Sequence, residues 1–570
     1  MVSVDITKTP FSRYGAYLAV TAEPGQNTLT IHNCRRRFGE DVLHVLTFLH
    51  AGQPADIRLS ATPWVLDVAA AQGTARIYLA GDTSLVIASA GLDFRLELRT
   101  KLGYGVHEGP RRFKVIDVWA HLHIGADLYE GEGTLGGPRD EPMAGVSRPR
   151  NSDLTVTCAD GHALLRLEVS VPEPSPARPV ERPDVDADLA VIRAEWERFA
   201  AQLPAVAEHR KEIALLTWYN LWSCVVRAED VYRYDAMLMS KKFMCSVWSW
   251  DHCFNALAMA GTDPRMALEQ FLLPFELQSV TGVLPDLWNP NAELAWGVTK
   301  PPVHGWCFGR LMDCIPFDPP TLRRVYRYLE KLTRWWLVYR DANRNGIPEY
   351  PMGCDSGWDN STLFDEAFFV ETPDLPAFLV LQMDTLARIA EALGRPAAAL
   401  KWRRKATALW SRFMRSSWNG RNFVVRMADS PAVIEEPTSL LALMPLVLGD
   451  RLEPAVFAAL VARLEADFLT EHGPATEALR SPKYKSDGYW RGPIWAPTTY
   501  LICDGLLRGG RRDLAVRIAR GFCDMIQHRA GGNYENFDAV TGRGLCAPGY
   551  TWTASVNLLL LEQLHREGVE

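Results

Sequence analysis

The most informative stretch of the sequence is Pro348-Glu-Tyr-Pro-Met-Gly-Cys-Asp-Ser-Gly-Trp-Asp-Asn-Ser-Thr362. It carries two carboxylates, Asp355 and Asp359, around a Ser-Gly pair and a tryptophan. On one helix these acids would share a face and repel each other, whereas Ser356-Gly357 favours a loop, because glycine permits turns that other residues resist. An acid beside Trp358 would be partly dehydrated, which favours the protonated form that a proton donor needs. A surface turn with an aspartate N-cap fits the same residues, so local chemistry leaves both interpretations open.

The first 171 residues have the pattern of an antiparallel β-sandwich. Apolar and polar side chains alternate in Thr28-Leu-Thr-Ile-His32, Phe94-Arg-Leu-Glu-Leu98 and Leu165-Arg-Leu-Glu-Val-Ser-Val171, as they do in strands with one buried face. Glycine and proline separate these runs at short intervals, which is typical of a sandwich. We expect the glycine-rich stretch from Tyr129 to Gly137 to be a long loop.

The rest of the chain is expected to be helical. A proline-rich segment at 172–187 predicts an extended, semi-rigid linker between an N-terminal domain at 1–171 and a second domain at 188–570. Helical periodicity dominates the second domain, with Pro454 opening one helix and Gly394 capping another. Many helices with few convincing strands fit a closed ring of helical hairpins, the (α/α)6 toroid.

Composition argues against several classes of function. The 570 residues carry a formal net charge of −7, whereas a nucleic-acid-binding protein needs a basic face, so no nucleic-acid partner is expected. We see no signal peptide and no apolar window approaching about 18 residues, so no membrane partner is expected. The eleven cysteines show no Cys-x-x-Cys spacing, which favours reduced thiols and a cytoplasmic location. The sequence does not indicate an oligomeric state.

Four further motifs surround the central stretch. They are Trp248-Ser-Trp-Asp251; Gly282-Val-Leu-Pro-Asp286 followed by Thr299-Lys-Pro-Pro302 and Trp306; Tyr489-Trp-Arg-Gly-Pro-Ile-Trp495; and Asn533-Tyr-Glu-Asn-Phe-Asp538 with Thr541-Gly542. Together with Ser356-Gly-Trp-Asp-Asn-Ser361 they resemble, in order, the motifs of family 63 glycoside hydrolases and of the related trehalases. The resemblance runs from Trp248 to Ser555 and implies an (α/α)6-barrel catalytic domain. One departure is Thr362, where many relatives have proline, and this should alter the loop but not the acid.

The resemblance assigns two catalytic carboxyl groups. Family 63 enzymes invert the anomeric configuration, and the motif positions imply that Asp359 is the general acid and Glu535 the general base. From the residues alone, Glu535 lies in a polar, glycine-led loop that could approach a ligand closely, although a turn fits as well and Asp538 is a rival base. Asp355 and Asp365 are rival acids outside the motif position. Inversion needs carboxyl groups about 6.5–9.5 Å apart, so that a water molecule fits between them.

The same resemblance implies a set of substrate-binding residues. Trp250 and Asp251 resemble the pair that holds the terminal sugar, with the carboxylate accepting hydroxyl hydrogen bonds. Arg491 resembles an arginine that contacts the active site. The other residues predicted to line the cavity are Lys300, Trp306, Trp358, Asn360, Tyr489, Trp490, Gly492, Trp495 and Trp552. For each aromatic residue, packing in the core is an equally good explanation.

A possible ion-binding loop lies just before the central stretch. The segment from Asp341 to Glu349 has the D-x-N-x-N-G spacing of a calcium loop, in which oxygen ligands alternate around a glycine bend. Its predicted ligands are Asp341, Asn343, Asn345, Ile347 and Glu349. Some family relatives bind calcium in this segment, but position twelve of this loop is Met352 rather than glutamate. A hydrogen-bonded Asx turn explains the pattern equally well.

These observations predict an inverting exo-α-glycosidase that hydrolyses a terminal α-glucosyl or α-mannosyl unit from a small glycoside or oligosaccharide. Candidate substrates are glucosylglycerate, mannosylglycerate, a short α-oligosaccharide and trehalose. No catalytic cofactor is expected, because no histidine cluster has zinc spacing. A phosphorylase on the same barrel, and a catalytically inactive carbohydrate-binding protein, are the alternatives. The presence of both Asp359 and Glu535 argues against the inactive protein, which would need neither.

Overall fold

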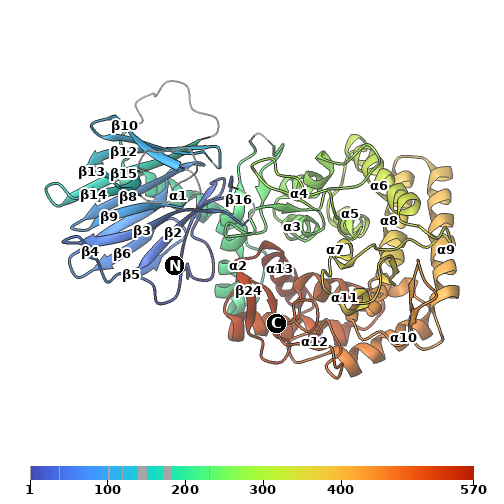
Figure 1. Cartoon of the computed structure of the whole chain (residues 1–570). Helices are drawn as coiled ribbons and strands as arrows, with labels where there is room; N and C mark the ends of the chain where they lie inside the picture. The colour runs from blue at the N-terminus through green and yellow to red at the C-terminus, as the bar shows by residue number, and fades with distance from the viewer. Residues whose placement is uncertain are drawn as a thin grey trace. The chain divides into compact units, whose positions relative to one another are not determined.

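The computed structural model of the protein describes residues 2–36, 39–99, 103–118, 120–138, 151–170, 181–229 and 231–569 (Figure 1). The chain divides by its internal contacts into two compact units. The first consists of Met1–Leu203, Trp218–Ser246 and Asn289–Glu293, and the second of Pro204–Thr217, Val247–Trp288 and Leu294–Glu570. Residues 172–180 of the predicted linker lie outside the described residues. The predicted boundary at residue 188 falls inside the first unit, and the predicted domain limits stay a prediction.

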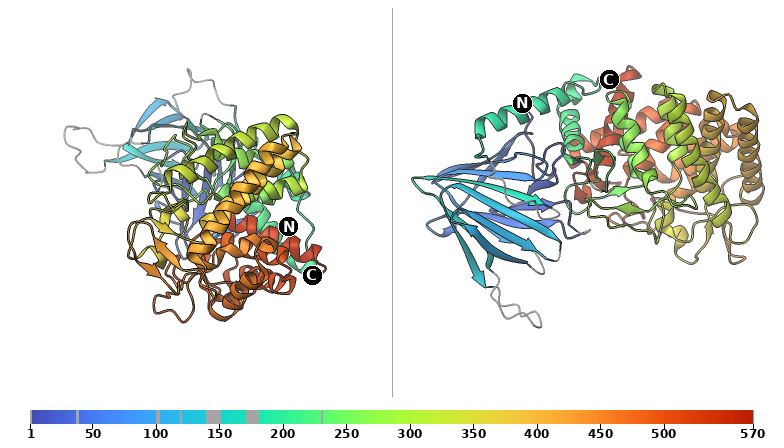
Figure 2. Two further views of the ribbon diagram at one scale, coloured as in Figure 1. Left: turned by 90° about the vertical axis from the view of Figure 1, so that its right-hand side faces the viewer. Right: turned by 90° about the horizontal axis from the view of Figure 1, so that it is seen from above.

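Two antiparallel sheets build the first unit, which confirms the predicted β-sandwich (Figure 2). The first sheet has the order β1-β2-β3-β9-β14-β13, with β4 on β3, and its strands are Leu18–Ala22, Thr28–Asn33, Val42–His50, Asp93–Leu98, Asn151–Thr157, Glu132–Pro138 and Gln53–Pro54 in that order. The second has the order β10-β11-β12-β15-β8-β7-β6-β5, and its strands are Gly103–Gly109, Arg112–Asp117, Leu122–Glu130, His162–Ser170, Ser84–Ala90, Gly73–Leu79, Leu66–Ala70 and Arg58–Ala61. Phe94, Leu96 and Leu98 alternate into the core from β9, as their spacing predicts.

The expected loop from Tyr129 to Gly137 is wrong. Strand β12 runs to Glu130, and β13 (Glu132–Pro138) pairs with β14. The glycines serve other purposes: Gly131 has a left-handed φ of 94° that turns the chain, and a side chain at Gly133 would collide with the ring of Phe113. Glycine here marks a tight turn and a close approach within the sandwich, which composition alone does not distinguish from a loop.

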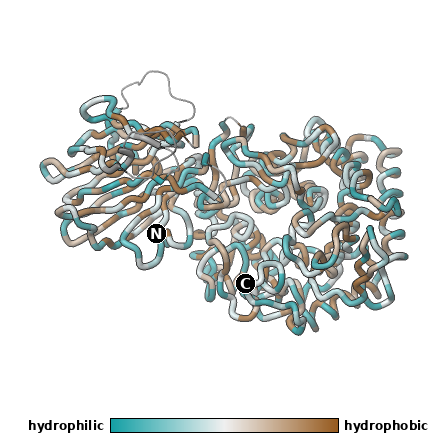
Figure 3. Tube along the Cα trace, in the orientation of Figure 1, coloured by the Kyte–Doolittle hydropathy of each residue, from teal (hydrophilic) through white to brown (hydrophobic). Residues whose placement is uncertain are grey.

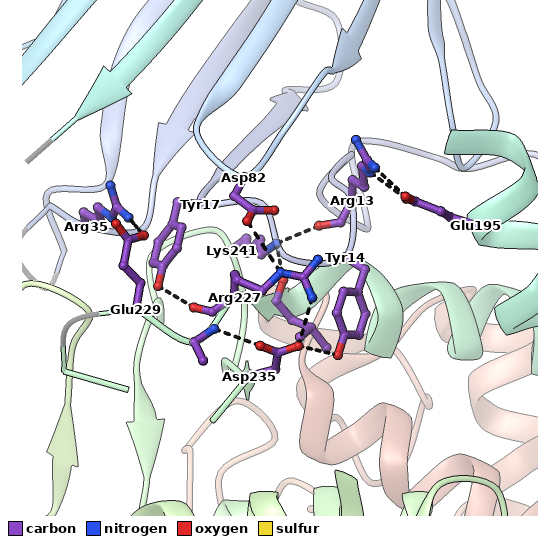
Figure 4. Close-up of polar contacts among 12 residues, drawn as sticks. Arg13, Tyr14, Tyr17, Arg35, Asp82, Glu195, Arg227, Glu229, Asp235 and Lys241 are labelled. Carbon is purple, nitrogen blue, oxygen red and sulfur yellow. Dashed lines mark hydrogen bonds and ion pairs between the residues drawn. The ribbon is translucent and has the colours of Figure 1, made fainter. Parts of the chain in front are cut away.

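A segment that follows helix α2 (Lys211–Cys224) also belongs to the first unit, and polar contacts tie it to residues before β1 and between β7 and β8 (Figure 4). Arg227 bridges Asp82 at 3.5 Å and Asp235 at 3.1 Å, and Tyr14 donates a hydrogen bond to Asp235 at 2.7 Å. The ammonium group of Lys241 is fully buried and donates to the Val225 carbonyl at 2.9 Å. Buried charge of this kind persists only where hydrogen bonds replace the lost water.

Six helices close a ring in the second unit (Figures 1 and 2). Each contacts the next along the chain and the last contacts the first; they are α3 (Asp251–Met259), α5 (His304–Cys314), α8 (Asp374–Ala392), η3 (Leu440–Arg451), α11 (Ala496–Arg508) and α13 (Thr551–Arg566). Outer helices pack against them; they are α4 (Pro264–Glu276), α6 (Pro319–Tyr339), α9 (Pro396–Ser417), α10 (Pro454–Arg463) and α12 (Arg512–Met525). The predicted (α/α)6 toroid is confirmed.

The inner and outer helices differ in the way that their sequences require. Every residue of α3 is buried, and nearly every residue of α13, because these inner helices are covered on all sides. The outer helix α6 instead has one buried stripe that includes Leu322, Leu329 and Trp336, with charged residues elsewhere. Gly394 ends α8 in the left-handed conformation, with φ of 69°, as predicted for a cap. In the described part of the chain, no helix is long and apolar enough to cross a bilayer; the cytoplasmic location stays a prediction.

Glycine allows the inner helices to approach closely. A side chain at Gly505 on α11 would collide with the carbonyl oxygen of Leu446 on η3, and one at Gly305 on α5 would collide with the backbone of Gln382 on α8. These clashes involve backbone atoms, which cannot turn aside as a flexible side chain can. Closure of the ring therefore depends on these two positions having no side chain.

We expect Gly505→Ala to lower the free energy of unfolding by about 1–3 kcal/mol, because the added methyl group must push two helices apart. Urea denaturation measures this change. Gly261→Ala is the matched control, since a side chain there meets open space, and it should leave the unfolding midpoint nearly unchanged. Equal midpoints for both variants would show that the ring tolerates wider spacing at η3.

Candidate active site

Asp359 lies in a loop that separates it from Asp355. The short helix α7 (Gly353–Ser356) ends at Gly357, whose left-handed φ of 75° reverses the chain beneath the ring of Trp250. Asp355 stays on α7, where Arg340 pairs with it at 2.8 Å. The side chain of Asp359 lies beyond the turn and is 34% exposed. The loop expected from Ser356-Gly357 is therefore present, and the rival acid Asp355 is already neutralised by an arginine.

Lys300 lies before helix α5, and its ammonium group is the centre of the site. Its Nζ lies 3.4 Å from Asp286 Oδ1 and 3.5 Å from Asp359 Oδ1, and donates to the Cys354 carbonyl at 3.1 Å. Burial opposes the charge of Lys300, but Asp286, Asp359 and Asp251 together raise its pKa above the ordinary lysine value. Lys300 therefore keeps its positive charge at neutral pH.

Two buried aspartates lie near Lys300, and one of them, Asp251, has an unused hydrogen-bonding atom. Asp251 begins helix α3, where the helix dipole favours a negative charge, and Asp286 ends its motif immediately before strand β19 (Leu287–Trp288). Burial raises the pKa of both carboxyl groups, while Lys300 acts in the opposite direction. Within the described residues, Asp251 Oδ2 and the indole nitrogen of Trp552 have no hydrogen-bond partner, whereas Asp286 Oδ1 is paired with Lys300. Buried atoms of this kind suit the hydroxyl groups of a sugar, which both donate and accept.

Glu535 lies on strand β23 (Tyr534–Phe537), which pairs with β24 (Gly544–Pro548), just before inner helix α13. It is 5% exposed, and Tyr489 donates a hydrogen bond to its Oε1 at 2.8 Å. Burial raises the pKa of Glu535, the Tyr489 hydrogen bond lowers it, and the negative charge of Asp359 raises it. Asp359 and Glu535 are 176 positions apart in the sequence. In the fold they lie close enough to interact electrostatically.

Tryptophan rings form a connected wall around these groups. Trp490 stacks on Trp495 with ring centroids 3.8 Å apart and planes inclined by 8°, and Trp358 lies 4.8 Å from Trp490. Trp552 meets the rings of Trp495 and Trp250 edge to face, at 5.4 and 5.7 Å. All five are buried. Such a wall is rigid and excludes water, which strengthens electrostatic interactions within the site.

Three predicted residues hold the loops together. Asn360 uses both polar atoms of its side chain, donating to the Gly488 carbonyl at 3.0 Å and accepting from the Trp490 amide at 2.9 Å. Arg491 donates to the Asn360 carbonyl at 2.6 Å and pairs with Asp365. At Gly492 any side chain would collide with the Lys485 carbonyl. The structure thus places these residues beside the acid, with their polar groups engaged by protein.

Trp306 and the remaining rivals lie in other surroundings. Trp306 is buried on inner helix α5, and its indole donates to Asp504 on α11 at 2.8 Å. Its role in sugar binding stays a prediction. The rival acid Asp365 is paired with Arg491, and the rival base Asp538 accepts two backbone hydrogen bonds from the turn that follows it. The carboxyl groups of both rivals are therefore held by other groups of the protein. The carboxyl group of a proton donor must instead face the substrate.

Two residues of the site were missing from the predicted set. Asp286 closes the motif Gly282-Val-Leu-Pro-Asp286, so the motif itself was the signal that could have included it. Tyr550 is buried beside Glu535, whose charge contributes, after burial, to raising the pKa of the tyrosine far above its ordinary value. No motif position pointed to Tyr550. Its place follows from the start of helix α13, which brings it under β23.

The predicted ion-binding loop follows helix α6 and is closed by hydrogen bonds. Asp341 Oδ2 accepts from the Gly346 amide at 3.0 Å, and Asn345 Oδ1 accepts from the Ile347 amide at 2.8 Å. The amide groups of Asn343 and Asn345 both donate to Glu371 Oε1, at 2.9 and 2.6 Å. These are the bonds of an Asx turn, but one oxygen of each carboxylate is not used by them.

In and beside this loop, three buried carboxylate oxygens have no hydrogen-bond partner among the described residues: Asp341 Oδ1, Glu349 Oε2 and Glu371 Oε2. Burial raises the pKa of Glu349 to about 7, and the charges of Asp341 and Glu371 act in the same direction. Close carboxylates with unused oxygens fit a hard cation. However, no three acidic, histidine or cysteine side chains of the described chain already form a metal site, so backbone and amide oxygens would have to complete the shell.

Comparison with known proteins gives a consistent result. Residues 244–553 match a family model described as the mannosylglycerate hydrolase MGH1-like glycoside hydrolase domain. Mannosylglycerate hydrolase MGH1 of Selaginella moellendorffii is 23% identical over 393 residues, which cover 55% of this chain and 80% of that protein. Glucosylglycerate hydrolase of Mycolicibacterium hassiacum is 23% identical over 415 residues, covering 55% and 91%. A bacterial glucoamylase solved with acarbose shares the fold, with a TM-score of 0.62 at 11% identity, over 99% of this chain and 94% of its own.

We expect Lys300→Met to destabilise the protein more at pH 8 than at pH 5. Burial raises the pKa of Asp251 and Asp286, and Lys300 opposes that rise. Without Lys300, the pKa values of Asp251 and Asp286 in the folded protein rise further. The variant therefore loses more stability than the wild type as the pH increases through these pKa values. Removing one partner of a buried ion pair costs about 3–5 kcal/mol when the other stays charged.

Urea denaturation of wild type and variant at both pH values tests this expectation. Lys401→Met, at an exposed position of helix α9, is the matched control and should change stability little at either pH. A destabilisation by Lys300→Met that is the same at pH 5 and pH 8 would mean that Lys300 does not compensate ionised carboxylates.

Proposed function

Since the chain belongs to the MGH1-like glycoside hydrolases of family 63, we propose that it is an inverting, exo-acting α-glycosidase. The family match covers more than half of the chain and confirms the resemblance seen in the motifs, and with it the assignment as a glycoside hydrolase. The proposal adds that Asp359 protonates the leaving oxygen while Glu535 removes a proton from the attacking water.

The observation that supports these roles is the difference between two carboxyl groups that share one site. Asp359 is partly exposed next to Lys300, whereas Glu535 is buried and held by the Tyr489 hydroxyl. A general acid must reach the oxygen of a leaving group that points outward, and a general base must hold one water in a fixed direction. The two environments suit these two tasks.

The unused polar atoms of the site are best suited to bind the terminal sugar of the substrate. Asp251 has an unused buried oxygen, and Trp552 has an unused N–H. Because Asp251 is buried at the start of inner helix α3, a sugar held there would be the last unit of its chain, which supports exo action. We propose a glucosyl or mannosyl unit. The names of the relatives support glycerate as the other half of the substrate.

Two observations argue against the alternatives. A phosphorylase needs an unpaired cation for phosphate, yet Lys300 contacts Asp286 and Asp359, and Arg491 pairs with Asp365. An inactive binding protein has no use for two carboxyl groups in such different surroundings. Hydrolysis that proceeds without added phosphate is therefore the expected activity.

We expect the wild type to hydrolyse at least one substrate in a panel of mannosylglycerate, glucosylglycerate, trehalose and short α-oligosaccharides. Asp359→Asn and Glu535→Gln should each lower kcat by about 10²–10⁴-fold, because each removes one proton transfer. Proton NMR of the first product should show the β-anomer, as inversion of an α-linkage requires.

Matched controls are Asp429→Asn and Glu453→Gln, two exposed acids distant in sequence from every motif, whose activity should equal that of the wild type. Near-normal kcat in either active-site variant would remove the role assigned to that residue. An α-anomer as first product would exclude inversion, and turnover that appears only with phosphate would favour the phosphorylase.

We further propose that the loop from Asp341 to Glu349 binds one structural Ca²⁺. The support is the group of unused carboxylate oxygens on Asp341, Glu349 and Glu371. The loop leads directly into α7 and the segment that carries Asp359, so an ion here would stabilise the acid loop without taking part in the reaction.

Calcium should raise the melting temperature of protein that has been treated with a chelator and dialysed. Saturation at 100 times the Kd adds about 2.7 kcal/mol to the stability of the folded state. Asp341→Asn should lose most of this shift, and Asp429→Asn should keep it. Identical melting curves with calcium and with chelator would mean that the loop is an Asx turn that needs no ion.

A further inference from the structure

The turn Gly488–Arg491 contacts both the loop of Asp359 and strand β23 of Glu535, which carry the two proposed catalytic carboxyl groups. The Arg491 amide donates to the Gly488 carbonyl at 3.2 Å, which closes a tight four-residue turn. Tyr489, the second residue of the turn, has a left-handed φ of 64°. A large aromatic residue rarely adopts this conformation, and such strain persists only where surrounding contacts impose it.

One side of the turn is bound to the acid loop. Asn360, the residue after Asp359, donates to the Gly488 carbonyl at 3.0 Å and accepts from the Trp490 amide at 2.9 Å. The Asn360 carbonyl also accepts from Arg491 Nε at 2.6 Å. Three hydrogen bonds thus join a single residue to both ends of the turn. With both side-chain polar atoms engaged in this way, Asn360 is poorly placed to bind a sugar.

The other side of the turn is bound to the base. The Tyr489 hydroxyl donates to Glu535 Oε1 at 2.8 Å, and the Tyr489 carbonyl accepts from the indole of Trp495 at 2.9 Å. The tyrosine ring meets Trp495 edge to face at 4.9 Å. Trp495 itself is stacked on Trp490 and fully buried. The position of the hydroxyl is therefore set by the same stack that holds the turn.

We propose that this turn is a spacer that sets the separation of Asp359 and Glu535, with Asn360 and Tyr489 as its two positioning residues. The inference rests on the proposed function and adds to it, because both residues had been expected to contact the sugar. An inverting reaction is sensitive to this separation, since the water and the glycosidic bond must fit between the two carboxyl groups. A misplacement of about 1 Å is enough to lower a rate by roughly 100-fold.

Loss of Asn360 is expected to displace the acid and loss of Tyr489 the base, and these two displacements affect catalysis differently. With an ordinary α-glycoside, the bond from C1 to the leaving oxygen breaks as Asp359 gives that oxygen a proton, and Glu535 takes a proton from the attacking water. With an α-glycosyl fluoride, the C1–F bond breaks and fluoride leaves as an anion without needing that proton. Water must still attack C1 and lose a proton to Glu535. Displacement of the acid therefore affects only the glycoside, whereas displacement of the base affects both substrates.

The experiment compares kcat on the best α-glycoside and on the α-fluoride of the same sugar. Asn360→Ala should lower kcat on the glycoside by roughly 100-fold, with KM nearly unchanged, and should leave kcat on the fluoride close to that of the wild type. Tyr489→Phe should lower kcat on both substrates by the same factor. Asn419→Ala and Tyr339→Phe, at surface positions outside the site, are the matched controls and should behave as the wild type.

A pH profile gives a second readout for Tyr489. Its hydrogen bond lowers the pKa of Glu535, so Tyr489→Phe leaves that pKa higher. Because a general base must be ionised, the acidic limb of the kcat/KM profile should move to higher pH. A role in packing alone would leave this limb in place, since the ring is retained.

Several results would contradict the proposal that this turn is a spacer. One is a raised KM with normal kcat in Asn360→Ala, which would identify a sugar contact. Another is an equal loss on glycoside and fluoride in that variant, or an unchanged acidic limb in Tyr489→Phe. If Asn360→Ala does not fold, as judged by circular dichroism, Tyr489→Phe still decides through its pH profile. A wild type that hydrolyses none of the α-glycosides would instead defeat the proposed function, so the two failures are distinguishable.

Discussion

The ammonium group of Lys300 compensates the negative charge of the carboxylates in the candidate active site. Asp251, Asp286 and Asp359 surround Lys300 in a region that is largely closed to water, where an unpaired carboxylate is costly. Burial alone would drive Asp251 and Asp286 to the neutral form. Lys300 opposes that tendency for Asp251 and Asp286, so the site can hold several carboxyl groups close together and still offer unused oxygens to a ligand.

The tryptophan wall makes this arrangement rigid. Trp490 and Trp495 stack face to face, and Trp552 meets both Trp495 and Trp250 edge to face. Apolar rings lower the local dielectric constant, which strengthens the attraction of Lys300 for its partners. Their packing also allows Tyr489 to hold an unfavourable backbone angle, because the cost of order 1–3 kcal/mol is small beside the contacts that impose it.

The ring of helices explains why residues so distant in sequence meet. Asp251 begins inner helix α3 and Lys300 lies just before α5, while the segments that carry Asp359, Tyr489 and Glu535 precede α8, α11 and α13. Closure of the ring brings these starts together at one end. Glycines such as Gly505, which let neighbouring helices approach, thus bear on the geometry of the site as well as on stability.

The sequence by itself determined the two architectures and the motifs. Alternation in strands such as β9 and the helical stripes after residue 188 report burial that is set locally, every second or every third to fourth residue. The resemblance of the motifs to those of family 63 also singled out Asp359 and Glu535 as candidates. The sequence could not separate a turn from a loop at Gly131 and Gly133, or show that Arg340 neutralises Asp355 while Lys300 faces Asp359. Nor could it show that Asn360 binds protein. Those outcomes depend on which side chains meet across the closed ring, and only the tertiary structure decides such distances.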